Sequence, residues 1–171
     1  MRVSNGRLRN CAIAAAVAFA IALLGAASAS ASAHWRISAR AAPTNLPLEG
    51  TGFVDVLVTE SGEAELSATN TPVTIRDVLP VGITATSVLA RWQGNLNHEF
   101  EKDWKCSGAG TREVTCSYNP SGNAENERFP IAQYEDLELQ IHVAVKASAG
   151  AYTNNVSVEG ARSSARCCSS F

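Results

Sequence analysis

Short runs of β-favouring residues, separated by turn residues, fill the chain beyond about residue 50, and no sustained helical period interrupts them. The clearest run is 137–145, where apolar residues at odd positions alternate with mainly polar residues at even positions, His142 among them. A period of two predicts a strand with one buried and one solvent-facing side. This run therefore sets the class of the fold as all-β.

Four further strands follow from the same reasoning, at residues 53–59, 73–79, 83 to about 92, and 152–159. Leu79-Pro80-Val81-Gly82, with proline second and glycine fourth, predicts a type I turn between two of them. With the cysteine-containing hairpin described below, the total is about seven strands. That number and spacing predict an Ig-like antiparallel β-sandwich of two sheets.

The first 33 residues have the pattern of a secretory signal peptide. Arg2, Arg7 and Arg9 precede an apolar, Ala-rich run from Cys11 to Leu24, and overlapping small-x-small sites lead to predicted cleavage after Ala33. The apolar run is shorter than the roughly 20 strongly apolar residues of a spanning helix, which favours a cleaved signal over a permanent anchor. We expect a secreted or extracellular mature chain, associated with the cell surface or free, without stable membrane insertion.

Two of the five cysteines, Cys106 and Cys116, are expected to form a disulfide. They flank a flexible reversal, and a register that sets them opposite each other also sets Trp104 opposite Tyr118. Closing this loop contributes roughly 2–3 kcal/mol. The oxidising environment after export favours the bond over two free thiols, and the spacing is poor for zinc.

The ends of the mature chain show weaker patterns. Residues 34–50 read as an extended, Pro-containing leader, with Pro43 and Pro47 around Leu46 and Leu48, and the sandwich spans 51–160. Residues 161–171 show neither strand alternation nor a helical period, so we expect a disordered tail whose deletion barely changes stability. The alternative is that Cys167 or Cys168 anchors the tail or joins two chains, which an even number of mature cysteines permits.

Composition and charge argue against several classes of function. Hydrophobic residues make up 46% of the 171 residues, and 14 Lys plus Arg stand against 16 Asp plus Glu, for a net charge of −2. One globular domain fits this length. The sequence lacks the basic excess that nucleic-acid binding requires.

No group of residues forms a catalytic or metal-binding pattern. His34, His98 and His142 are scattered, without a paired nucleophile. Acidic residues gather in 98–103 and 125–127, but without the ligand spacing of a calcium loop, so solvated loops are the favoured interpretation. We therefore expect no enzyme activity, no cofactor and no required metal.

Two stretches have a distinctive order of residues, namely Val73-Thr74-Ile75-Arg76-Asp77-Val78-Leu79-Pro80-Val81-Gly82-Ile83 and the ending Tyr152-Thr153-Asn154-Asn155-Val156-Ser157-Val158. In these stretches the chain resembles a bacterial conserved-repeat family known as domain of unknown function eleven, and the likeness covers about residues 50 to 160, one repeat. The resemblance implies an Ig-like sandwich of secreted or surface-attached proteins, with no established catalytic residues. It leaves open whether the chain is a whole protein or one copy from a longer repeat protein.

These observations predict a non-enzymatic secreted or cell-surface module with a structural or adhesive role. Its partners are undefined, with other surface proteins and glycans as the candidate classes. The alternative is a secreted carbohydrate-binding domain that stacks sugars on exposed tryptophans, for which Trp92 and Trp104 are the candidates. Two coplanar tryptophans exposed on one face would distinguish the alternative.

Overall fold

Nine β-strands and no helix make up the part of the chain that the computed structural model describes, namely residues 33–63, 72–92, 104–119, 131, 133–160 and 163–170. All of these residues belong to one compact unit, Ala31–Phe171. The predicted signal segment lies outside the described residues, apart from Ala33. The strands are β1 (Trp35–Ala42), β2 (Thr51–Glu60), β3 (Val73–Val78), β4 (Ile83–Trp92), β5 (Trp104–Ser107), β6 (Glu113–Tyr118), β7 (Asp136–Val145), β8 (Thr153–Gly160) and β9 (Ser163–Ser170).

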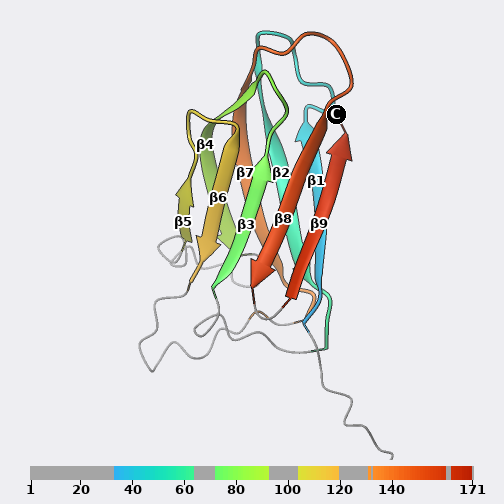
Figure 1. Cartoon of the computed structure of the whole chain (residues 1–171), viewed down its shortest axis with the longest axis vertical. Helices are drawn as coiled ribbons and strands as arrows, with labels where there is room; N and C mark the ends of the chain where they lie inside the picture. The colour runs from blue at the N-terminus through green and yellow to red at the C-terminus, as the bar shows by residue number, and fades with distance from the viewer. Residues whose placement is uncertain are drawn as a thin grey trace, which may run out of the picture. The chain divides into compact units, whose positions relative to one another are not determined.

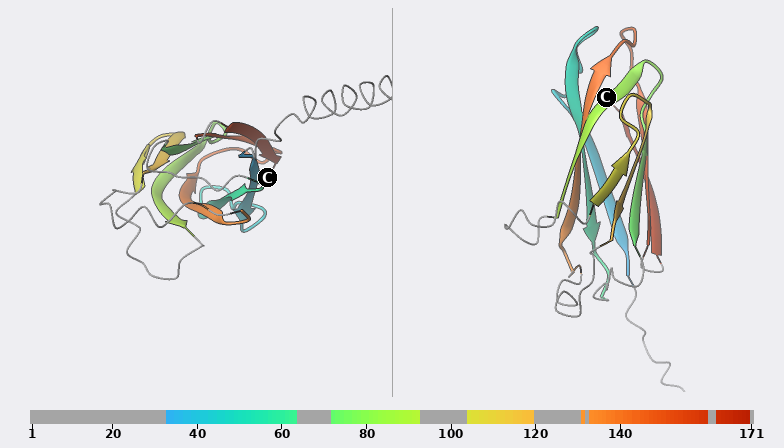
Figure 2. Two further views of the ribbon diagram at one scale, coloured as in Figure 1. Left: turned by 90° about the horizontal axis from the view of Figure 1, so that it is seen from below. Right: turned by 90° about the vertical axis from the view of Figure 1, so that its left-hand side faces the viewer.

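The strands form two antiparallel sheets packed face to face, which confirms the predicted sandwich (Figures 1 and 2). The four-stranded sheet has the order β1-β2-β7-β4, and the five-stranded sheet has the order β5-β6-β3-β8-β9. Non-sequential neighbours such as β2 and β7 show that most of the pairing is long-range. The outermost strands of the two sheets form the rims of the sandwich. β4 and β5 form one rim, and β1 and β9 form the other.

The core between the sheets follows the alternation read from the sequence. Along β7 the apolar residues are buried, whereas His142 is exposed, as predicted. On β2, the side chains of Val54, Val56 and Val58 have no solvent exposure. Burying a side chain of this kind contributes about 1.5–3 kcal/mol, so the inward faces of these central strands carry much of the driving force for folding.

The turn between β3 and β4 is displaced by one residue from the predicted type I turn. The Ile83 N–H donates to the Pro80 carbonyl oxygen at 3.1 Å, so Pro80 is the first residue of the turn and Gly82 the third. Gly82 has a φ of 85°, as a type II turn requires at its third position. A Cβ there would lie 2.8 Å from the Ala147 Cα, so glycine is also needed to admit the neighbouring loop.

The sandwich has nine strands instead of about seven because the segments before and after the predicted seven strands, residues 35–42 and 163–170, also form strands. β1 lies in the predicted leader, where Trp35, Ile37, Ala39 and Ala41 point inward between polar residues. β9 occupies residues that we expected to form a disordered tail, and this expectation is wrong. β9 pairs along its whole length with β8, and these backbone hydrogen bonds do not depend on an apolar side-chain pattern.

Candidate functional site

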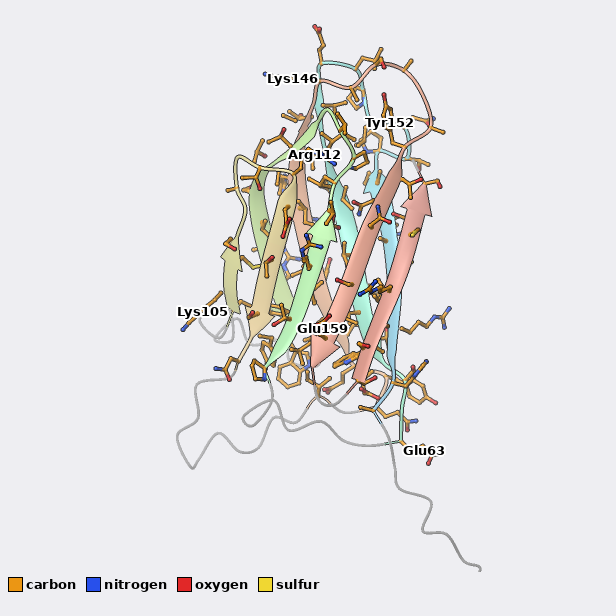
Figure 3. The ribbon with its side chains drawn as sticks, in the orientation of Figure 1. Glu63, Lys105, Arg112, Lys146, Tyr152 and Glu159 are labelled. Carbon is orange, nitrogen blue, oxygen red and sulfur yellow. A yellow bond between two sulfur atoms is a disulfide. The ribbon has the colours of Figure 1, made fainter. Side chains whose placement is uncertain are left out.

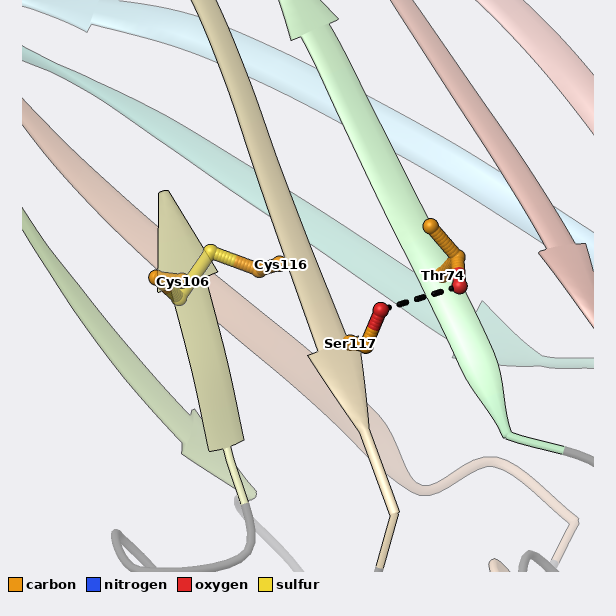
Figure 4. The surroundings of a disulfide bond; sticks show 4 residues. All are labelled: Thr74, Cys106, Cys116 and Ser117. Atoms are coloured by element: carbon orange, nitrogen blue, oxygen red, sulfur yellow. Dashed lines mark hydrogen bonds between the residues drawn. A yellow bond between two sulfur atoms is a disulfide. The ribbon is translucent and has the colours of Figure 1, made fainter. Parts of the chain in front are cut away.

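Cys106 and Cys116 form the predicted disulfide, with 4.1 Å between their Cα atoms (Figure 4). Their register is also the predicted one, because Cys106 pairs with Cys116 and Trp104 pairs with Tyr118. On the other side of β6, Ser117 and Thr74 share a hydrogen bond of 3.1 Å between their hydroxyl oxygens. The disulfide therefore fastens the short strand β5 to β6, which pairs on its other side with β3.

The two candidate sugar-stacking tryptophans are buried. Trp92 is 7% exposed and Trp104 is 9% exposed, so they do not form an exposed platform. Both pack against Tyr118, with ring centroids 6.4 Å and 5.1 Å from that of the tyrosine. Because Trp92 belongs to one sheet and Trp104 to the other, this aromatic cluster joins the two sheets at the β4–β5 rim.

The histidines and acidic segments do not assemble into a reactive centre in the part of the chain described. His34 and His142 lie apart, the first before β1 and the second on the outer side of β7 near the Phe53 ring. His98 and both acidic segments, 98–103 and 125–127, lie outside the described residues. Within the described ranges, no three His, Cys, Asp or Glu side chains are placed to hold a metal ion.

Asp77 and Asn154 form a buried polar pair that the sequence reasoning missed. Neither side chain is exposed, and the Asn154 Nδ2 donates to Asp77 Oδ2 at 2.8 Å. Burial raises the pKa of Asp77 to about 6, against the smaller opposing effect of this hydrogen bond. Asp77 Oδ1 and Asn154 Oδ1 have no hydrogen-bond partner.

Glu60 is a second buried carboxylate, and it fixes the backbone where β1 begins. Its Oε1 accepts hydrogen bonds from the His34 N–H at 3.0 Å and the Gly62 N–H at 2.5 Å. Its backbone carbonyl accepts from the Tyr134 N–H at 2.6 Å. Glu60 thus holds three chain segments together, which is a role in the fold.

An apolar pocket opens at one end of the sandwich, between the β1–β2 loop and the β7–β8 loop. Its volume is about 240 Å³. Lys146 and Tyr152 mark this end in Figure 3, whereas Glu63 lies at the opposite end. The walls are mainly apolar and come from Leu46, Leu48, Ile83, Val145, Ala147 and Tyr152, with Asn45 and Ser148 as polar members.

The geometry of the pocket is fixed by hydrogen bonds within its loops. The Tyr152 hydroxyl donates to the Ser148 carbonyl oxygen at 2.7 Å, which holds the ring against the loop. Leu48 is 56% exposed at the mouth. The local sign in the sequence is Leu46 and Leu48, which lie on either side of Pro47 in the predicted leader. This pocket is the candidate binding site, suited to an apolar side chain or a small ring.

No known protein family and no curated protein matches the chain. Solved structures do match its fold. The full-length major pilin SpaD from Corynebacterium diphtheriae aligns over 79% of this chain and 34% of that chain, at 9% identity and a TM-score of 0.57. BcpA, the major pilin subunit of Bacillus cereus, aligns over 79% of this chain and 38% of that chain, at 11% identity and a TM-score of 0.55.

These likenesses support the assignment of an Ig-like sandwich and concern the fold alone. This chain spans little more than a third of the length of either pilin. Among the described residues, no helix is long and apolar enough to cross a membrane.

Proposed function

We propose that this chain is a non-enzymatic structural and adhesive module of a secreted or cell-surface protein. The signal-like first 33 residues, the resemblance to the conserved-repeat family and the fold shared with pilin domains all support the proposal. Fold alone does not establish function, which depends on the sites that this chain carries.

The observation that carries the proposal is the end pocket. The described surface offers a preformed, mainly apolar cavity there, between loops at one end of the sandwich. A cavity of about 150 Å³ lined by apolar side chains can hold benzene, so one of 240 Å³ has room for an aromatic or branched aliphatic side chain. An end pocket of this kind suits the capture of an apolar side chain from a partner protein.

The buried polar groups support the structural half of the proposal. Asp77, Asn154 and Glu60 are all fully buried, and the hydrogen bonds described above link them to other parts of the same sandwich. Both candidate tryptophans are core residues, so the carbohydrate-binding alternative loses the exposed platform on which it depended.

Two experiments test the proposal. Protease added to intact cells of the native host should digest the protein. Survival of the protein inside those cells would contradict a surface or secreted location.

For the pocket, 4-methylphenol is the probe, titrated into the labelled protein and followed by NMR.

We expect saturable changes in the chemical shifts of Leu46, Leu48 and Tyr152, and Leu48→Glu should abolish these changes. Val81→Glu is the matched control, because Val81 is 71% exposed but does not line the pocket. Equal chemical-shift changes in Leu48→Glu and in the unchanged protein would show that the probe does not bind in the pocket.

A further inference from the structure

The four edge strands of the sandwich differ in how they are protected against pairing with another chain. Native sheets protect their edges with charges, prolines, bulges, short strands or covering segments. β5 has only four residues and is held by the disulfide. β4 has an irregular register between Ala85 and Ser87, and Ala85 exchanges two 2.8 Å backbone hydrogen bonds with the β5–β6 turn. β1 carries exposed Arg36 and Arg40 and is followed by Pro43.

β9 lacks the short length, the irregular register and the pairs of charges of the other edge strands, and β1 is the segment that contacts it across the rim. It is eight residues long, its register with β8 runs without a break from Ser163 to Ser170, and Arg166 is its one charged residue. Within the described part of the chain, β9 pairs only with β8, because β1 contacts it across the rim but pairs as a strand with β2. Figure 1 shows β9 as the last strand of its sheet. Its serine, alanine and cysteine side chains allow another backbone to approach closely.

β9 also carries the two free thiols of the described chain. Cys167 is partly buried and Cys168 is exposed. Successive side chains of a strand point to opposite faces, so the two sulfur atoms cannot bond to each other while β9 is intact. The Cys168 thiol donates to Asn155 Oδ1 at 3.2 Å, which keeps it on the outer face of the sheet. Cys167 pairs with buried Val156 and so lies on the inward face, where its thiol donates to the Cys168 carbonyl oxygen at 3.5 Å. Each thiol can therefore form a disulfide only with a sulfur atom outside its own strand.

We propose that β9 is a self-association edge, at which two copies of this chain pair strand to strand and become cross-linked through cysteine. A second copy is the occupant that the thiols favour, because a two-fold axis normal to the sheet sets β9 antiparallel to its own copy. Directly opposed residues then lie on the same face, so a cysteine can oppose only the like-numbered cysteine of the second copy.

Charge selects among the registers that this symmetry allows. A register centred on Arg166 sets two guanidinium groups directly opposite each other, which is unfavourable. A register centred on Cys167 pairs residues 164–170 of both copies, sets Cys167 opposite Cys167 of the second copy, and sets Arg166 opposite Cys168 of the second copy. Centring on Cys168 shortens the overlap.

The covalent step is an exchange with a small-molecule disulfide such as oxidised glutathione. One sulfur–sulfur bond forms between the two copies, and the sulfur–sulfur bond of the small molecule breaks. Its two sulfur atoms leave as thiols with the two cysteine protons, so atoms and electrons balance. A lasting bond requires an oxidising compartment, and in this respect the inference rests on the proposed extracellular location.

The test compares cross-linking of the secreted full chain with that of a matched exposed thiol. In the control, Cys167→Ser and Cys168→Ser are combined with Ala149→Cys, which places one thiol on the exposed β7–β8 loop. Under oxidised glutathione, non-reducing gels should show the β9 dimer forming at least about tenfold faster than the loop dimer, because prior pairing raises the effective concentration. Sedimentation of the reduced chain should show a concentration-dependent dimer.

Peptide mapping of the dimer decides the geometry. A bond between like-numbered cysteines supports the pairing, with Cys167 to Cys167 as the expected product. A bond from Cys167 to Cys168 of the other copy, cross-linking no faster than the loop control, or only glutathione adducts on a monomer would overturn the inference. The localisation experiment is independent, so failure of the dimer and failure of the surface assignment can be told apart.

Discussion

The two rims of the sandwich are closed by different means. At the β4–β5 rim, the Cys106–Cys116 bond, the Trp92–Tyr118–Trp104 cluster and the backbone bonds of Ala85 act together. At the β1–β9 rim, the first and last strands contact each other, and the Trp35 Nε1 donates to the Gly160 carbonyl oxygen at 3.3 Å. Figure 2 shows this second rim, where β1 and β9 lie side by side.

The difference lies in how far apart in the chain the partners are. β5 and β6 form a hairpin of neighbouring segments, so little chain entropy is lost when they pair. Residues 35 and 160 are far apart in the sequence, so the contact at the other rim forms only when most of the sandwich is already in place. The β4–β5 rim should therefore withstand local damage, whereas the β1–β9 rim should depend on a single large side chain.

The largest expected effect is that of Trp35→Ala. Trp35 is 2% exposed, and removing a buried tryptophan costs about 3–5 kcal/mol in free energy of unfolding. Urea unfolding measures it, with Trp35→Phe as a control that keeps a ring but loses the bond to Gly160. Trp104→Ala should cost less, since the disulfide still holds β5. A larger loss for Trp104→Ala than for Trp35→Ala would reverse the comparison.

The second prediction concerns Asp77, which lies between the rims on β3. Its folded-state pKa of about 6 is above its ordinary value of 3.8, so the folded chain binds this proton more tightly than the unfolded chain. The stabilisation is complete below pH 3.8 and is lost as the pH rises towards 6, with an upper limit of about 3 kcal/mol.

Asp77→Asn is the control for the pH effect. Its amide has the shape of the protonated acid and does not titrate, so the difference in free energy of unfolding between the two proteins should change between pH 4 and pH 7. Chemical unfolding at several pH values measures this difference. If it stays constant across that range, Asp77 does not titrate as its burial indicates.

The sequence predicted those parts of the fold whose pattern is local. The alternation of 137–145 and the hairpin around Cys106 and Cys116 each lie in a few consecutive residues, and both are present as predicted. β9 was missed because its side chains show no alternation of apolar and polar residues. The strand is ordered by its backbone pairing with β8. The end pocket and the Asp77–Asn154 pair join residues distant in the chain, and no local pattern indicates that such residues meet.

A smaller loss is expected when the disulfide is removed. Replacing both Cys106 and Cys116 with alanine should lower the free energy of unfolding by about 2–3 kcal/mol, through the added chain entropy of the unfolded state. The control is the double variant that combines Cys167→Ser and Cys168→Ser, which removes the same number of sulfur atoms at the other rim. Denaturant midpoints measure both. Equal effects of the two double variants would mean that the bridge contributes nothing beyond its side chains.

The smallest expected effect is that of deleting β9 by ending the chain after Ala161. Ordering each residue costs about 1–2 kcal/mol in backbone entropy, and the hydrogen bonds to β8 slightly more than offset that cost. Of the β9 side chains, Ala165 is the one that packs against the core, so little apolar burial is added. We expect a net loss of about 1–2 kcal/mol, read from the denaturant midpoint, with a slightly smaller m-value because less surface is exposed. The full-length Cys167→Ser, Cys168→Ser variant separates the strand from its thiols, and it should keep the midpoint of the unchanged chain. A truncated chain with that same midpoint would show that β9 adds no stability, so that its order matters only for what pairs with its free edge.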